Sequence, residues 1–166
     1  GYDGNYLKDF WMYNPETNEW SQKVSVGGSK RRDGVGFVIN GKGYVCTGVN
    51  NGVYESDFWE YDPIADQWTG KRDIADVSDD DYDDDYDVPR TSAVAFSANG
   101  LGYVVTGGKS TVSGDAWEYD PVTDLWEEKT SMEGTDRMES VAFTLGNKGY
   151  VLTGRSSSFY FDDVWC

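Results

Sequence analysis

The chain has 166 residues, of which 30 are acidic and 14 basic, and it contains no histidine, so its net charge at pH 7 is −16. Such a charge argues against nucleic acid or an anionic membrane surface as a partner, because both would repel the protein. No apolar run is long enough to cross a bilayer, and the length favours a single domain.

A stretch of the form Asp-x-Trp-x-Tyr-x-Pro recurs along the chain. It begins at Asp9, Asp57 and Asp115, and a fourth copy opens at Asp163. A second tryptophan follows nine residues after the first in each complete copy, at Trp20, Trp68 and Trp126. This self-similarity, with a period of about 50 residues, predicts a repeat architecture.

Each full repeat predicts four short strands, here termed a to d. The first, incomplete copy has only strands c and d, around Trp11 and Trp20. Strands a to d of the next two repeats are expected at 34–40, 44–47, Trp59 and Trp68, and at 92–97, 103–106, Trp117 and Trp126. The last copy has strands a to c, at 140–145, 150–153 and Trp165. Asn-Gly or Gly-Asn pairs between strands a and b favour tight hairpins, since both residues tolerate a positive φ. Proline after strand c presets a turn and ends the ladder.

Four antiparallel strands per repeat are typical of a β-propeller blade. The glycine after strand b, the Tyr-Asp-Pro turn and the tryptophan spacing resemble the kelch repeat family. The resemblance implies an all-β, kelch-type β-propeller with four-stranded antiparallel blades. We expect residues 1–166 to form a single partial propeller domain, divided into 1–30 (strands c–d), 31–89 (a full repeat with an acidic insertion at 76–88), 90–136 (a full repeat) and 137–166 (strands a–c).

About three blades of an expected six-bladed ring are therefore visible. Propellers close with about 4–8 blades, so either the chain is a piece of a longer propeller or a second copy completes the ring. We favour the first interpretation.

Three arginines, Arg31, Arg90 and Arg137, each precede strand a of a repeat. In a propeller the d–a and b–c connections emerge on one face. In kelch domains that bind peptides, arginines at this position contact acidic ligands, so the resemblance implies a ligand-binding role for these three. The alternative is structural: each arginine pairs with an acidic side chain of the neighbouring blade.

The b–c connections are polar and differ between repeats, as binding loops on a fixed scaffold do. Their candidate ligand-binding residues are Asn50, Asn51, Tyr54, Lys109, Arg155 and Tyr160. These side chains suit ligands rich in hydroxyl or carboxylate groups. The alternative is that they are solvated connections.

An acidic run occupies residues 79–87. Its carboxylates are the oxygen ligands that Ca²⁺ prefers, and the candidate calcium ligands are Asp79, Asp81, Asp83, Asp85 and Asp87. A block of like charges is more often a solvated loop, which is the other interpretation, and no other cofactor is predicted.

The remaining repeated residues predict structure rather than chemistry. The tryptophan and tyrosine rows favour packing between blades over a sugar-stacking platform, and the repeated aspartates favour hydrogen bonding at strand starts. Cys46 falls in a strand and is expected to be buried, whereas Cys166 is expected to be exposed. A disulfide or a metal site built from this pair is not predicted.

These features favour a noncatalytic module that binds a protein or a glycan through the face of its d–a and b–c loops. The enzymatic alternative is a carbohydrate-active enzyme similar to the sialic acid mutarotase family, which needs a general acid and a general base near an anomeric hydroxyl. The copper site of galactose oxidase needs histidines, which this chain lacks. The residue sequence of the repeats resembles that of bacterial exported kelch proteins, which implies a periplasmic, secreted or cell-surface location.

Overall fold

The computed structural model describes residues 1–75 and 86–166, and those residues form strands, turns and loops without a helix. β1 (Phe10–Asn14) and β2 (Glu19–Lys23) form a hairpin. The next sheet contains β3 (Val35–Ile39), β4 (Lys42–Cys46), β7 (Trp59–Asp62) and β8 (Gln67–Gly70). It is followed by a sheet of β9 (Val94–Ala98), β10 (Leu101–Val105), β11 (Ala116–Asp120) and β12 (Leu125–Lys129), and then by one of β13 (Val141–Leu145), β14 (Lys148–Leu152) and β15 (Val164–Trp165).

These sheets confirm the antiparallel four-stranded blade that the repeat predicts. Strands a, b, c and d correspond to β3, β4, β7 and β8 in the second blade, and the other blades follow the same order. β5 (Val49–Asn50) and β6 (Val53–Tyr54), a short hairpin within one b–c connection, were not predicted. β4 ends at Cys46 rather than at residue 47, because Thr47 has a left-handed backbone conformation with φ 58°.

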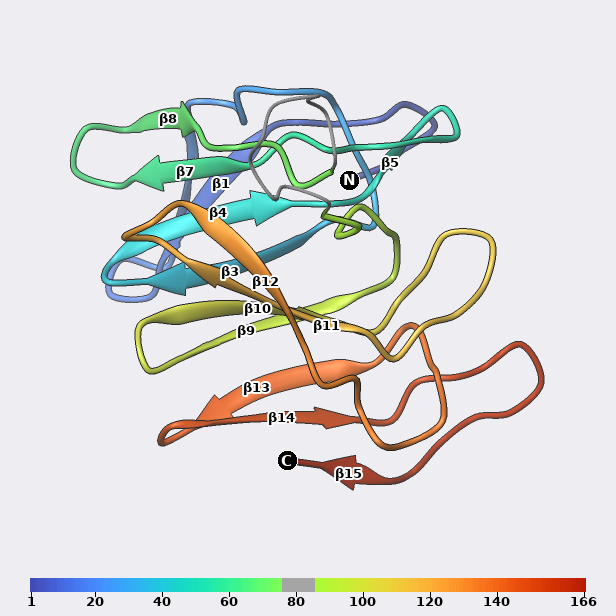
Figure 1. Ribbon diagram of the computed structural model, residues 1–166. Helices are drawn as coiled ribbons and strands as arrows, with labels where there is room; N and C mark the ends of the chain where they lie inside the picture. Colours follow the sequence, from blue (N-terminus) through green and yellow to red (C-terminus); the bar gives the residue numbers. More distant parts are fainter. Residues whose placement is uncertain (76–85) are drawn as a thin grey trace, which may run out of the picture.

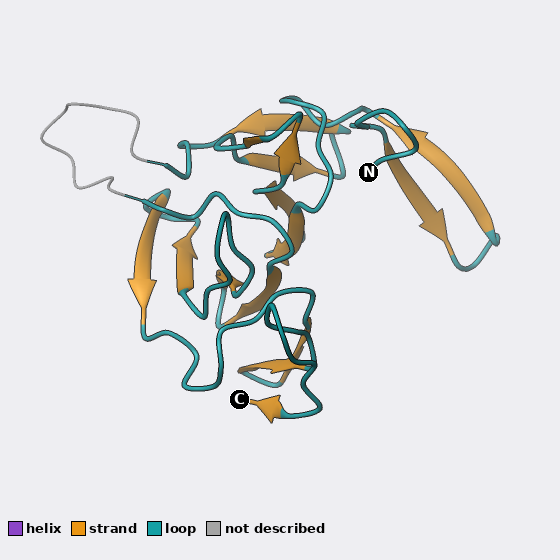
Figure 2. Cartoon of the chain, turned by 90° about the vertical axis from the view of Figure 1, so that its right-hand side faces the viewer, coloured by secondary structure: helices purple, strands orange, loops and turns teal. Residues whose placement is uncertain are grey.

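The blades follow one another around an open arc (Figure 1), and the ring is not closed. The first strands of successive blades, β3, β9 and β13, lie side by side on the inner side of this arc, as Figure 2 shows from a second direction. The a–b and c–d turns lie along one edge of the blades, and the b–c and d–a connections lie along the other. No membrane-spanning helix occurs in residues 1–75 and 86–166.

Glycines in strand b allow the blades to approach closely. A Cβ atom added to Gly102 would lie 2.3 Å from the ring of Phe37 in the preceding blade, and one added to Gly149 would lie 2.1 Å from the ring of Phe96. Each of these phenylalanines also stacks on the strand-b tyrosine of its own blade, with 5.4 Å between the centroids of Phe37 and Tyr44. The glycine of the Gly-Tyr pair therefore lets a ring from one blade approach the backbone of the next.

The phenylalanine of the Asp-Phe-Trp stretch makes a second contact between blades. Phe58 packs edge-on against Tyr119, with 4.6 Å between centroids, and against Trp126 of the next blade. Phe10 makes the same contacts one blade earlier. Offset and edge-to-face aromatic pairs contribute about 0.5–1.5 kcal/mol beyond their buried area. The packing role predicted for the repeated aromatic residues agrees with these contacts.

Candidate functional site

The b–c connections form a row of small hairpins along one edge of the blades. Backbone bridges close these hairpins between Tyr2 and Tyr6, Val49 and Tyr54, Gly108 and Val112, and Arg155 and Tyr160. Figure 2 looks onto this edge. We call the surface made by residues 1–7, 49–55, 108–114 and 155–161 the loop face.

The bases of the hairpins in the second and third blades are held in the same way. The amide of Gly48 donates a 2.9 Å hydrogen bond to the carbonyl of Arg90 in the next blade, and the amide of Gly107 does the same to Arg137. Both glycines have positive φ, and a Cβ atom on Gly107 would lie 2.6 Å from the carbonyl oxygen of Thr91. These two hairpins therefore share a hydrogen-bonded base and differ toward their tips.

The predicted arginines lie beneath this base and are buried, with exposed fractions of 6% for Arg31, 3% for Arg90 and 0% for Arg137. Arg137 donates to the carbonyls of Thr135 and Thr153 and to both carboxylate oxygens of Asp163. Arg31 makes the corresponding contacts with Ser29, Thr47 and Asp57.

These contacts favour the structural interpretation of the arginines, with one correction. The aspartate that pairs with each arginine belongs to the same blade, just before strand c, and not to the neighbouring blade. Each ion pair thereby links the segment before strand a to the segment before strand c of the same blade.

The repeated Asp-x-Trp pair is part of the same network. Trp59 Nε1 donates to Asp57 at 2.8 Å, and Trp165 Nε1 donates to Asp163 at 2.7 Å. The guanidinium of Arg137 and the indole of Trp165 hold the pKa of the Asp163 carboxyl well below its usual range. The expectation that the repeated aspartates act as hydrogen-bonding groups at strand starts agrees with this geometry.

The third blade departs from this arrangement. Its Arg90 donates to the carbonyls of Val88, Thr106 and Asp87, at 3.0, 3.2 and 2.9 Å. Asp115 lies 3.8 Å from the Arg90 guanidinium, too far for a hydrogen bond. Trp117 Nε1 is buried, and no described residue accepts a hydrogen bond from it.

A pocket of about 230 Å³ opens at this place on the loop face. Arg90 lies in its wall, and the ion pair between Lys109 and Asp87 borders it. The remaining polar lining consists of Asp115 and the hydroxyl residues Ser110, Thr111 and Ser113. The structure thus brings two predicted residues, Arg90 and Lys109, into one pocket.

The other predicted loop residues occupy separate hairpins. Asn50 and Tyr54 are half-buried in β5 and β6, and Asn51 is exposed at the turn between them. Arg155 forms a bidentate pair with Glu139, with both N–O distances 2.7 Å, and this pair lowers the pKa of Glu139. Tyr160 is 88% exposed.

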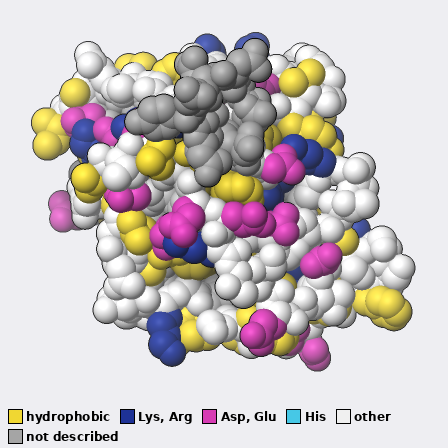
Figure 3. Space-filling model, in the orientation of Figure 1, with side chains coloured by type: hydrophobic (Ala, Val, Ile, Leu, Met, Phe, Trp, Pro, Cys, Tyr) yellow, Lys and Arg dark blue, Asp and Glu magenta, His cyan; other side chains and the backbone are white. Residues whose placement is uncertain are grey.

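Two aromatic side chains at the loop face were not predicted as site residues. Tyr2 and Tyr6 pack edge-on, 5.1 Å apart, and the Arg32 guanidinium lies 5.5 Å from the centroid of Tyr2. Aligning residues 1–8 with the later b–c connections would have found this hairpin. Phe159, 70% exposed beside Tyr160, was also missed. Hydrophobic side chains protrude at the lower right of Figure 3, the side on which the 155–160 loop lies in Figure 1.

Four of the candidate calcium ligands, Asp79, Asp81, Asp83 and Asp85, lie outside the described residues. The fifth, Asp87, is exposed and pairs with Lys109. In residues 1–75 and 86–166 no group of three or more His, Cys, Asp or Glu residues is placed to hold a metal. Calcium binding by the acidic run stays a prediction. Cys46 is buried and Cys166 exposed, as expected, and both are free thiols.

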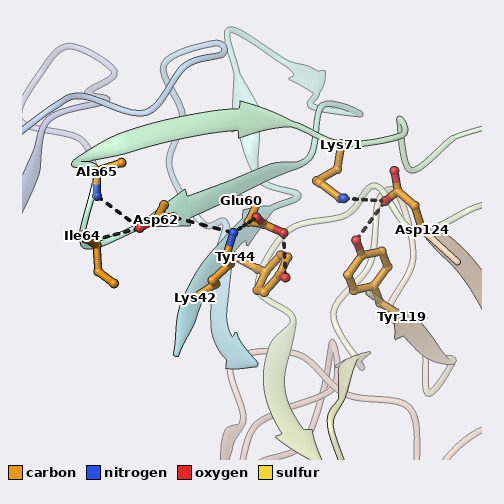
Figure 4. Close-up of polar contacts among 9 residues, drawn as sticks. All are labelled: Lys42, Tyr44, Glu60, Asp62, Ile64, Ala65, Lys71, Tyr119 and Asp124. Carbon is orange, nitrogen blue, oxygen red and sulfur yellow. Dashed lines mark hydrogen bonds and ion pairs between the residues drawn. The ribbon is translucent and has the colours of Figure 1, made fainter. Parts of the chain in front are cut away.

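A second cluster of ionisable residues lies near the c–d turns, at the edge away from the loop face (Figure 4). Tyr44 and Lys42 both donate to Glu60, at 2.8 and 2.7 Å. Tyr119 donates to Asp124 at 2.8 Å, and Lys71 of the preceding blade lies 3.6 Å from the same carboxylate. Burial and the neighbouring carboxylates raise the pKa values of both tyrosines, so neither suits proton transfer near neutral pH.

Comparisons with known proteins agree with this architecture. Residues 1–26 match the Kelch motif, and no curated protein matches the chain. A solved structure described as "Structure of YjhT" superposes with a TM-score of 0.75 at 13% sequence identity, over 95% of this chain and 48% of that one. The chain therefore spans about half the length of that protein. Together, the repeated blades and the shared fold show a β-propeller of the kelch type, in which residues 1–26 carry a recognisable kelch repeat.

Proposed function

We propose that this chain is a noncatalytic binding module that holds a protein or glycan ligand on its loop face. The observation that carries the proposal is the contrast between the bases and the tips of the b–c hairpins. Glycine amides fix the bases in register from blade to blade, while the tips differ in sequence and shape. Variable loops on a rigid scaffold are a common form of binding surface.

The chemistry of the tips supports recognition of a ligand. Tyr160, Phe159 and Tyr2 are exposed aromatic side chains, and tyrosine and arginine are enriched among residues that dominate binding energy. Arg155 and Lys109 are held by ion pairs with Glu139 and Asp87. Their charged groups are therefore positioned before a ligand arrives, which reduces the entropy lost on binding.

Asp73 is the observation that favours the enzymatic alternative of the sialic acid mutarotase type. Its carboxyl is half-buried, and burial together with the charge of Asp57 raises its pKa. A raised carboxyl pKa suits a general acid. The lining of the loop-face pocket does not include Asp73, however, so we favour the binding proposal.

An array of glycans and peptides probed with the purified chain tests the proposal. Each ligand that binds is then measured with the loop-face variants Tyr160→Ala and Arg155→Ala. The control is Ile64→Ser, an exposed position in a c–d turn at the opposite edge. Loss of a residue that dominates binding costs at least about 2 kcal/mol, which is roughly a 30-fold loss of affinity.

We expect that loss from at least one loop-face variant and an unchanged affinity from Ile64→Ser. Equal weakening by Ile64→Ser, or no bound glycan or peptide on the array, would refute the proposal. Acceleration of sugar mutarotation that disappears in Asp73→Asn would establish the enzymatic alternative instead.

A further inference from the structure

In the third blade, Asp115 does not make the hydrogen bond to the arginine that its counterparts make in the neighbouring blades. The backbone carbonyl of Asp87 accepts from Arg90 Nη2, whereas the corresponding Nη2 groups of Arg31 and Arg137 donate to an aspartate carboxylate. A carbonyl supplied by the segment leading into strand a thus replaces the carboxylate that precedes strand c.

The surroundings of Trp117 in the third blade also differ from those of Trp59 and Trp165 in the neighbouring blades. Glycines pass close to Trp59 and Trp165, since a Cβ atom on Gly28 or Gly134 would lie 2.4 or 2.9 Å from the respective indole Nε1. In the third blade the ring of Tyr86 packs edge-on against Trp117, with 6.2 Å between centroids. The indole Nε1 that Asp115 would satisfy is left without an acceptor among the described residues.

A buried donor without an acceptor costs about 1–3 kcal/mol, so the released position of Asp115 calls for an explanation. The side chain of Asp115 is 45% exposed, compared with 24% for Asp57 and 38% for Asp163, and it lines the loop-face pocket. We propose that Asp115 has been released from the network of the blade to bind a small, hydroxyl-rich, uncharged ligand such as a monosaccharide unit. This inference rests on the proposed binding function of the loop face.

The charge of the pocket defines the ligand class. Among the described residues that line the pocket, two cationic side chains, Arg90 and Lys109, balance two anionic ones, Asp87 and Asp115, so this lining favours neither a cation nor an anion. Carboxylates only accept hydrogen bonds, lysine and arginine only donate them, and serine and threonine do both. Sugar hydroxyls donate and accept, and can therefore satisfy such a mixed set.

The size of the pocket limits the ligand. Its volume of about 230 Å³ is below the roughly 300–1,000 Å³ typical of pockets for drug-sized ligands. A single sugar ring or a cyclic polyol is a suitable size. Ser113 Oγ accepts the amide proton of Asp115 at 2.9 Å, so its hydroxyl proton remains available for a ligand oxygen.

Titration of the ¹⁵N-labelled chain, followed by NMR, tests this site. The probes are the methyl glycosides of galactose, glucose and mannose, together with free myo-inositol. Spermidine and succinate serve as cationic and anionic comparators. We expect at least one uncharged probe to shift the amide signals of Ser110, Thr111 and Ser113 and the indole signal of Trp117. Binding of a glycoside but not of myo-inositol would indicate the end of a glycan, whereas binding of both would indicate a free polyol.

Two variants separate release for binding from a structural role. Asp115→Asn should weaken probe binding at least about tenfold while leaving the melting temperature unchanged. Asp57→Asn should lower the melting temperature, because Asp57 accepts from both Arg31 and Trp59.

Three outcomes would overturn the inference: no shift in the pocket with any uncharged probe, shifts with spermidine or succinate alone, or destabilisation by Asp115→Asn equal to that by Asp57→Asn. Failure of the proposed binding function is distinguishable. If an array ligand binds Asp115→Asn normally but not Tyr160→Ala, the loop face binds and only the assignment of Asp115 is wrong.

Discussion

Replacing Arg137 by methionine should destabilise the chain by about 3 kcal/mol. Arg137 is fully buried and hydrogen-bonded to two carbonyls and to Asp163. A hydrogen bond to a charged group contributes about 1.5–3 kcal/mol, and the bond to the half-buried Thr153 should lie within that range. The Asp163 side chain is 38% exposed, so solvent screening reduces its share to about 1 kcal/mol. The bond to Thr135, an exposed residue, adds little.

Urea unfolding followed by tryptophan fluorescence measures this change. Arg155→Met is the matched control, because it removes an arginine whose pair with Glu139 lies at the surface and should alter the unfolding free energy little. Equal destabilisation by the two variants, or none by Arg137→Met, would refute the structural role given to the buried arginines.

The same pair of variants predicts a pH dependence. The pKa of Asp163 in the folded chain lies below its usual 3.8, so its stabilising contribution is complete above that value and is lost as the pH falls through the folded pKa. The stability difference between the parent chain and Arg137→Met should therefore be constant near neutral pH and shrink below about pH 4. A difference that grows on acidification would contradict this assignment.

Three further predictions concern packing and protection. Gly102→Ala should destabilise the chain by about 1–3 kcal/mol, because its methyl group would overlap the ring of Phe37. The control Gly43→Ala meets only ordinary contacts and should lower the urea midpoint less. Equal effects of the two variants would contradict the packing account. Burial and a hydrogen bond to Glu118 raise the pKa of Tyr103 to about 12, so Tyr103 should ionise only above pH 10. Ultraviolet absorbance of the parent chain, compared with that of Tyr103→Phe, measures this ionisation, and a midpoint near pH 10 would contradict the prediction. Burial also raises the pKa of the Cys46 thiol to about 12, so a thiol reagent should modify Cys166 rapidly and Cys46 only on unfolding. Rapid modification of both thiols in the folded chain would contradict the burial of Cys46.

Much of the fold could be predicted from the sequence because its determinants are local and repeated. The Asp-x-Trp-x-Tyr-x-Pro stretch combines an alternating strand pattern with a proline turn, and each copy forms strand c as predicted. The glycines that admit phenylalanine rings from the preceding blade were visible as part of the Gly-Tyr pair. Their role was missed because a contact between blades leaves no local pattern.

The candidate site was less predictable for the same reason. The spacing placed Arg31, Arg90 and Arg137 at equivalent positions, but spacing does not show which acceptors surround a side chain. Burial of all three depends on backbone carbonyls that only the folded chain brings together. The release of Asp115 was invisible in the sequence, because Asp115 occupies the same motif position as Asp57, whereas the carbonyl that accepts from Arg90 comes from Asp87 in another connection.

Replacement of the loop tips tests the central claim most directly, namely that repeated residues build the blades while variable tips bind. Residues 50–53, 109–111 and 156–159 would be exchanged together for Gly-Ser segments of equal length. Affinity for a ligand identified on the array and the free energy of unfolding would then be measured on the same protein. We predict at least about a tenfold loss of affinity, or 1.4 kcal/mol, with an unfolding free energy that changes by less than about 1 kcal/mol, since surface loops tolerate substitution. Unchanged affinity in a folded variant would contradict the account.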